Sequence, residues 1–67
     1  MTIEEIIKAA GGAKAIADAS AGTIKRDAVY KWAAIGIPDR HWPILILLAG
    51  VTPQQLFDAN LLARVAA

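Results

Sequence analysis

Residues 25–38 read KRDAVYKWAAIGIP, and this stretch decides how the rest of the chain is organised. Val29 and Trp32 are spaced so that both fall on one face of an α-helix. The polar side chains fall on the opposite face: Arg26, Asp27, Tyr30 and Lys31. The stretch therefore predicts a helix that packs through an apolar half and presents a polar half outward.

The boundaries of this helix are set by its flanking residues. We expect it to begin at about Thr23 to Lys25 and to end near Ala34. The segment from Ile35 to Pro38 should break it, because glycine and proline both disfavour a continuing helix.

Two further helices are expected before it. Thr2 and Glu5 form the pattern of a capping box, and the helix that follows should end at Gly11 and Gly12. A second short helix should run from Ala13 to Ala19. The connection SAGT, residues 20–23, reads as a turn in which Gly22 takes a positive φ.

Two more helices are expected after it. The fourth should run from Pro38 or Asp39 to Ala49, and its Trp42 is more typical of a core position than of an interface. Thr52, Pro53 and Gln55 give a second N-terminal signature. The fifth helix should reach about Ala59 and bury Leu56 and Phe57, and the tail LLARVAA either extends it or forms a further turn. No segment has the alternation of a strand.

Composition narrows the class of protein. The chain has 67 residues, 57% of them hydrophobic, no cysteine, one histidine and a net charge of +1. This length allows one domain, and the residue types offer no metal site and no cofactor site. The acidic start MTIEEIIK lacks the positive charge of a signal peptide, and the run PILILLAGV is too short to span a membrane, so we expect a cytoplasmic protein.

These elements predict an all-α domain of five short helices over residues 1–60, followed by a C-terminal tail over residues 61–67. Three segments, GGAKAIADAS, GTIKRDAVYKW and GIPDRHWPILILLAGVT, resemble the Cro and repressor proteins of temperate phages. The likeness is to their all-helical Cro-like branch, over about residues 10 to 55. It implies a helix-turn-helix domain with the lambda-repressor-like fold, and it implies binding to double-stranded operator DNA.

The resemblance implies that the third helix, at about residues 24–34, reads the major groove. Arg26 is suited to donating twice to a guanine, while Asp27 would accept from cytosine or, as we prefer, orient Arg26 or Lys31. Tyr30 would contact a thymine methyl group or a phosphate, and Lys31 a guanine or the backbone. Phosphate contacts are expected from four further residues, which are Lys14, Lys25, Arg40 and His41.

A palindromic operator calls for a homodimer. Contiguous apolar residues cannot all face one small core, so we expect the interface in the C-terminal third, including the tail. The expected interface residues are Ile44, Leu47, Leu48, Leu61, Leu62 and Val65.

Two alternatives to a repressor of this kind remain. The low net charge favours a protein-interaction module, such as an antirepressor or adaptor, on the same scaffold. An enzyme is a more distant alternative, because no pair of catalytic groups is visible; we expect no catalytic residue and no small-molecule substrate.

Overall fold

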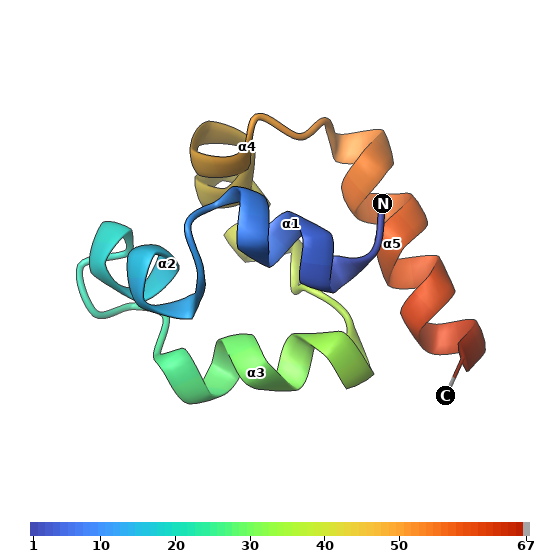
Figure 1. The fold of residues 1–67 in the computed structure, drawn as a ribbon, viewed down its shortest axis with the longest axis horizontal. Helices are drawn as coiled ribbons and strands as arrows, with labels where there is room; N and C mark the ends of the chain where they lie inside the picture. Colours follow the sequence, from blue (N-terminus) through green and yellow to red (C-terminus); the bar gives the residue numbers. More distant parts are fainter. Residues whose placement is uncertain (67) are drawn as a thin grey trace.

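The computed structural model describes residues 1–66, in which every regular element is helical. The elements are α1 (Ile3–Ala9), α2 (Ala13–Ala19), α3 (Arg26–Ile35), the 3-10 turn η1 (Asp39–His41), α4 (Trp42–Ala49) and α5 (Pro53–Ala66). Figure 1 shows α1 in the middle of the molecule, with α4 above it, α3 below it, and α2 and α5 at the two ends. The prediction of an all-α chain with five helices is confirmed.

Local capping fixes where the helices start. The Thr2 hydroxyl accepts from the Glu5 amide at 3.2 Å, and the Glu5 carboxylate accepts from the Thr2 amide at 2.8 Å. Thr52 and Gln55 repeat this arrangement at the start of α5, with distances of 3.1 and 2.9 Å. Both predicted N-terminal signatures are therefore confirmed, and each satisfies backbone amides that a helix leaves free.

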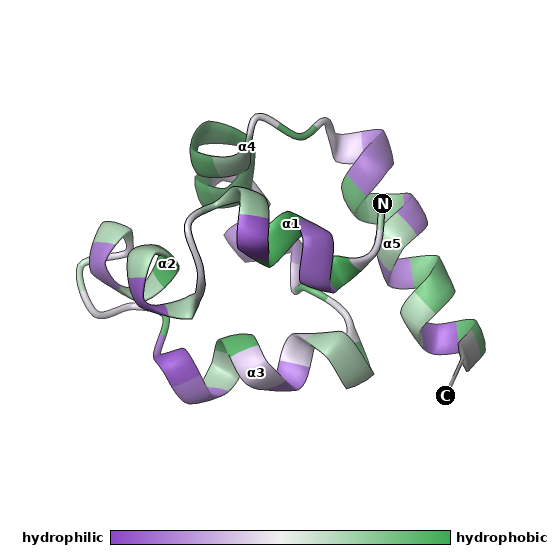
Figure 2. Ribbon diagram, viewed as in Figure 1, coloured by the Kyte–Doolittle hydropathy of each residue, from purple (hydrophilic) through white to green (hydrophobic). Residues whose placement is uncertain are grey.

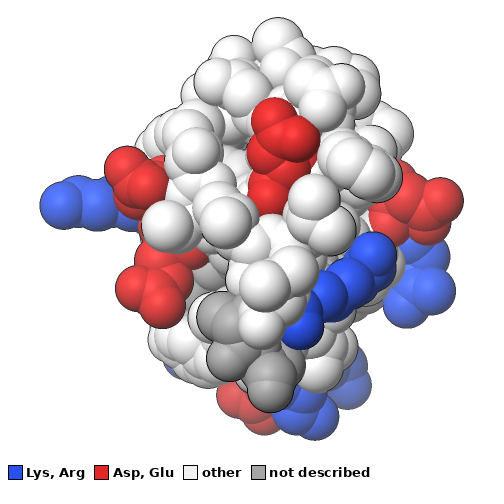
Figure 3. All heavy atoms as spheres, turned by 90° about the vertical axis from the view of Figure 1, so that its right-hand side faces the viewer, with Lys and Arg blue, Asp and Glu red and all other residues white. Residues whose placement is uncertain are grey.

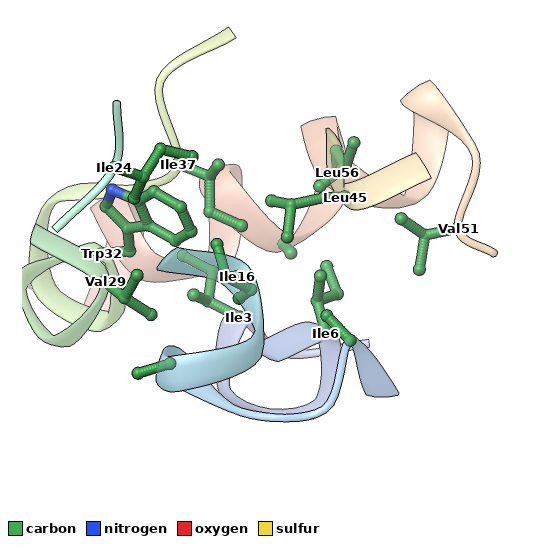
Figure 4. Close-up of a cluster of buried hydrophobic side chains, with 13 residues drawn as sticks. Ile3, Ile6, Ile16, Ile24, Val29, Trp32, Ile37, Leu45, Val51 and Leu56 are labelled. Carbon is green, nitrogen blue, oxygen red and sulfur yellow. The ribbon is translucent and has the colours of Figure 1, made fainter. Parts of the chain in front are cut away.

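The core draws side chains from every α-helix. Its largest fully buried side chains are Trp32, Ile6, Ile16, Ile37, Leu45, Leu56 and Val29. Figure 4 shows Trp32 with Ile24, Val29 and Ile37 around it, and Leu45 beside Leu56. The predicted burial of Val29 and Trp32 is confirmed, so α3 is held to the core through one face.

The start of α3 lies at Arg26, slightly later than expected, because Lys25 has an extended backbone and serves as the N-cap. The fourth helix opens as the 3-10 turn η1 before becoming α-helical at Trp42, and Pro43 lies in the first turn of α4. The helix α4 ends at Ala49, as expected, and Gly50 follows it in the left-handed conformation.

The helix α5 differs most from the prediction. It continues past Ala59 to Ala66, so residues 61–66 prolong the last helix of the domain. Phe57, which we expected to be buried, is 53% exposed. Leu56 takes the inward position, and the next residue on a helix is turned by roughly 100° from it.

Hydropathy alone does not mark the buried parts. Figure 2 shows α4 as apolar along its whole length, whereas α1 and α3 alternate between apolar and polar residues. Within α4, Leu45 is buried, while Leu47 is 82% exposed.

No helix among residues 1–66 is long and apolar enough to cross a membrane by itself. The helices Asp39–Ala49 and Pro53–Val65 reach the required length only as a pair, and this pair is bent by 120°.

Candidate nucleic-acid interface

The connection between α2 and α3 is organised by a buried serine. The Ser20 hydroxyl donates to the Ala17 carbonyl at 2.8 Å and accepts from the Ile24 amide at 2.9 Å. Ile24 is itself buried, so the hydroxyl joins the end of α2 to the residue that leads into α3. One side chain thus fixes the distance and direction between the two helices.

Two residues inside this connection have positive φ. Gly22, at 87°, was expected there, but Ala21, at 55°, was not. The Thr23 amide donates to the Ser20 carbonyl at 3.2 Å and closes the turn. Two consecutive residues with positive φ give this connection its reversal of direction.

The helix α3 places its polar residues on the face that points away from the core. Val29 and Trp32 are buried, and the four side chains expected to read bases are all exposed: Arg26, Asp27, Tyr30 and Lys31. The two faces of α3 therefore lie as the sequence predicts.

Charged groups near α3 are largely free of internal partners. Among residues 1–66 the one ion pair within 4.0 Å joins Lys14 to Asp18, both of them highly exposed. Asp27 thus makes no ion pair with Arg26 or Lys31, and the orienting contact we preferred for it is absent from the free protein. Lys14, a candidate phosphate contact, carries an acidic neighbour that competes for it.

Two grooves flank the α2–α3 connection. One lies between α2 and the start of α3 and brings together Ala17, Asp18, Gly22, Ile24, Lys25, Arg26 and Asp27. The other lies between the connection and α4 and is lined by Ser20, Thr23, Ile24, Arg40, His41, Pro43 and Ile44. The structure therefore groups Lys25 with Arg26 on one side and Arg40 with His41 on the other.

His41 is held by neighbours on two sides. Its ring centroid lies 5.8 Å from that of Trp32, and its Nε2 atom accepts from the Arg40 Nε group at 3.4 Å. Burial, followed by the positive charge of Arg40, lowers the pKa of His41 below its usual value. The neutral form of His41 is thus favoured. Its ring contributes by accepting the hydrogen bond from Arg40 and not by a positive charge of its own.

Sequence reasoning missed two residues at these grooves. Thr23 brings an exposed hydroxyl to the groove that contains Arg40, and Asp18 brings a carboxylate to the groove that contains Lys25. Their positions beside a helix end and a tight turn were visible in the sequence. Their proximity to the basic residues depends on how the turn folds.

The residues expected at a dimer interface divide into two groups. Leu47, Leu61, Leu62 and Val65 are exposed. Ile44 and Leu48 are half-buried and pack against the core, since α4 turns them toward the same side as Leu45. These two residues therefore have less surface to offer a partner than the sequence suggested.

The described residues contain no cluster of three or more histidine, aspartate or glutamate side chains able to hold a metal ion. The chain was also compared with known proteins. No protein-family model, no curated protein and no solved structure matches it.

Proposed function

We propose that this chain is a sequence-specific DNA-binding regulator of transcription. In this proposal α2, the turn and α3 act as a helix-turn-helix, α3 enters the major groove, and a homodimer binds a palindromic operator. Occupying a promoter in this way represses transcription.

The observation that carries the proposal is the two-sided character of α3. Its inner face is anchored by Val29 and Trp32, and its outer face presents a guanidinium, a carboxylate, a phenol and an ammonium group to solvent. An α-helix with its side chains is roughly 10–12 Å wide and the major groove is about 12 Å wide. A rigidly held helix with such a face is suited to reading base edges.

Each exposed side chain has a chemical role in this proposal. Arg26 lies in the first turn of α3, where a planar guanidinium can donate to O6 and N7 of a guanine. Tyr30 and Lys31 follow one turn later and contact a thymine methyl group, a guanine or a phosphate. Asp27, which makes no internal ion pair, is free to accept from a cytosine amino group.

Phosphate contacts are assigned to both grooves. Lys25 serves the groove beside α2, while Arg40 and the Thr23 hydroxyl serve the other. Lys14, which is exposed on α2, adds a contact outside both grooves. His41 assists by accepting the Arg40 Nε hydrogen bond. These contacts position the protein without reading sequence, and they make binding dependent on salt.

The test is selection of bound DNA from a random pool by the wild-type protein and by Arg26→Ala. We expect the wild-type protein to enrich a palindrome with guanine in each half-site, and Arg26→Ala to lose the preference at that guanine, by a factor of roughly 5–100. Lys8→Ala, which removes an exposed cation from α1 and lies in neither groove, is the control and should keep the preference. An unchanged preference in Arg26→Ala would show that Arg26 does not read bases.

A second candidate function is a protein-interaction module on the same scaffold. Two acidic residues, Asp18 and Asp27, favour this function. They lie in the same groove as Lys25 and Arg26 and weaken the attraction of that groove for phosphate. A salt titration separates the two functions. DNA affinity should fall steeply between about 50 and about 200 mM salt if several phosphates are neutralised, whereas no measurable DNA binding at the lower salt concentration would favour the interaction module.

A further inference from the structure

The outer face of α5 carries an apolar stripe that the single chain leaves uncovered. Phe57, Leu61 and Val65 are four residues apart and are 53%, 51% and 78% exposed. The inward face of the same helix is formed by Leu56, Ala59 and Asn60, which are buried. We call Phe57, Leu61 and Val65 the α5 stripe.

Charge is sparse around the α5 stripe. Figure 3 shows this side of the molecule as mostly uncharged, with acidic and basic groups gathered at its edges. An acidic group in the upper middle and a basic group below it interrupt the uncharged area. The charged residues of α5 are Asp58 and Arg64.

The order of these residues is symmetric about Leu61. Phe57 and Val65 lie four residues before and after it, and Asp58 and Arg64 lie three residues before and after it. A second copy packed antiparallel, with the two-fold axis at Leu61, would place Phe57 opposite Val65 of the second copy. It would also bring Asp58 of each copy to the level of Arg64 of the other copy. A parallel arrangement would instead place each of these charges beside the same charge of the other copy.

We propose that the α5 stripe is the seam of a homodimer, in which two copies of α5 pack antiparallel about Leu61. A second copy fits this surface better than another partner does. The two-fold rotation about Leu61 places apolar side chains against apolar side chains and each acidic group near a basic group. The inference rests on the homodimer of the proposed function and gives it a geometry, but it does not require DNA.

The seam changes which residues are expected at the interface. Phe57 joins it, although the sequence suggested a core position. Leu62 leaves it, because Leu62 turns toward α1 and lines a groove with Thr2, Ile3 and Glu4. Three large side chains cover on the order of 300 Å² per chain, less than half of a standard interface, so we expect a weak dimer that dissociates on dilution.

Cysteine cross-linking tests the register directly, because the chain has no cysteine of its own. Leu61→Cys places a thiol on the two-fold axis, where it meets its own counterpart within the reach of a disulfide. Leu62→Cys is the matched control, since Leu62 is an adjacent leucine of nearly equal exposure, 55% against 51%. We expect Leu61→Cys to form disulfide-linked dimers at least ~10 times faster than Leu62→Cys under mild oxidation.

The two outer positions test the antiparallel direction. Phe57 of one copy and Phe57 of the other would be offset by about 12 Å along the helix, too far for a disulfide. Phe57→Cys and Val65→Cys chains should therefore cross-link poorly alone but readily when mixed. Equal rates for Leu61→Cys and Leu62→Cys, or no gain on mixing, would overturn the seam.

The oligomeric state in solution, measured without DNA, separates the seam from DNA binding. Sedimentation should show wild-type dimers and Leu61→Asp monomers at tens of micromolar protein, with Leu62→Asp remaining dimeric. If the seam fails while the wild-type protein still selects a DNA sequence, the proposed function stands without it. If the cross-links form as expected but no DNA sequence is enriched, the seam stands and the proposed function fails.

Discussion

At the scale of single residues, the connection between α2 and α3 holds the clearest conformational cost. Ala21 is an exposed alanine with φ of 55°, and a side chain in this region costs about 1–2 kcal/mol. Glycine removes that cost but adds freedom to the unfolded chain. We expect Ala21→Gly to raise the free energy of unfolding by about 0.5–1 kcal/mol, measured by urea denaturation.

Gly22 supplies the opposite control for this prediction. Its φ is 87°, and no atom outside its immediate chain neighbours lies within 4 Å of an added Cβ. Gly22→Ala should thus lower the free energy of unfolding by about 1–2 kcal/mol through backbone strain. A destabilised Ala21→Gly would show that the alanine side chain contributes more to the turn than its conformation costs.

His41 makes stability depend on pH. Its pKa in the folded protein is lowered, first by burial and then by Arg40, so the unfolded chain binds a proton in a pH range where the folded chain does not. The contribution of neutral His41 to the free energy of unfolding is thus fully present above the pKa of histidine in the unfolded chain, about 6.5. It is lost as the pH falls through the lower pKa of His41 in the folded protein.

The free energy of unfolding should therefore decrease as the pH falls from about 7.5 to about 5, and His41→Gln should flatten this decrease. Urea denaturation of both proteins across this range measures the effect. The carboxylates contribute equally to both curves, so their difference isolates His41. Parallel curves would contradict the prediction.

At the scale of elements, Asn60 connects α5 to the segment between α3 and η1. Its amide oxygen accepts from the Ile37 amide at 2.7 Å, and its amide nitrogen donates to the Ile37 carbonyl at 2.9 Å. The Trp42 indole also donates to that carbonyl, at 3.0 Å. A buried side chain thus pairs with a segment of backbone that has no helix or sheet to satisfy it.

Asn60→Ala should lower the free energy of unfolding by about 2–3 kcal/mol, because it leaves the Ile37 amide buried without a partner. Chemical denaturation measures this loss, and faster hydrogen exchange at the Ile37 amide would locate it. Gln55→Ala removes an exposed capping contact from the same helix and should cost about 1 kcal/mol or less. Equal losses in the two variants would argue against a special role for Asn60.

The elements also separate what local sequence can predict from what it cannot. Thr2 with Glu5 and Thr52 with Gln55 act within one turn, and both capping pairs form as predicted. The burial of Phe57 was predicted wrongly, because Leu56 and Phe57 are equally suited to a core and only the packing of α5 on its neighbours chooses between them. Asn60 gave no signal, since its partner Ile37 is distant in sequence.

At the scale of the whole molecule, the core is small and depends on Trp32. A chain of 67 residues is expected to have a free energy of unfolding of roughly 3–10 kcal/mol. Removing a buried tryptophan side chain costs about 3–5 kcal/mol. We therefore expect Trp32→Ala to lose a large part of the stability of the domain, about 3–5 kcal/mol as measured by urea denaturation.

Leu47→Ala is the control for this prediction, because Leu47 is an exposed member of an equally apolar segment. Its free energy of unfolding should stay within about 0.5 kcal/mol of the wild-type value. A loss in Trp32→Ala as small as the loss in Leu47→Ala would mean that the helices hold together without the contact that anchors α3.

The sequence by itself determined the helical class, the capping boxes, the breaks at glycine and the two faces of α3, because each depends on residues within a turn or two of one another. Only the tertiary structure decided the left-handed Ala21, the contact of His41 with Trp32, the pairing of Asn60 with Ile37 and the exposure of Phe57. In a chain that is 57% hydrophobic, more residues are suited to burial than the core can hold. The packing of whole helices then selects which apolar residues remain outside, and here it leaves Phe57, Leu61 and Val65 on the surface of α5.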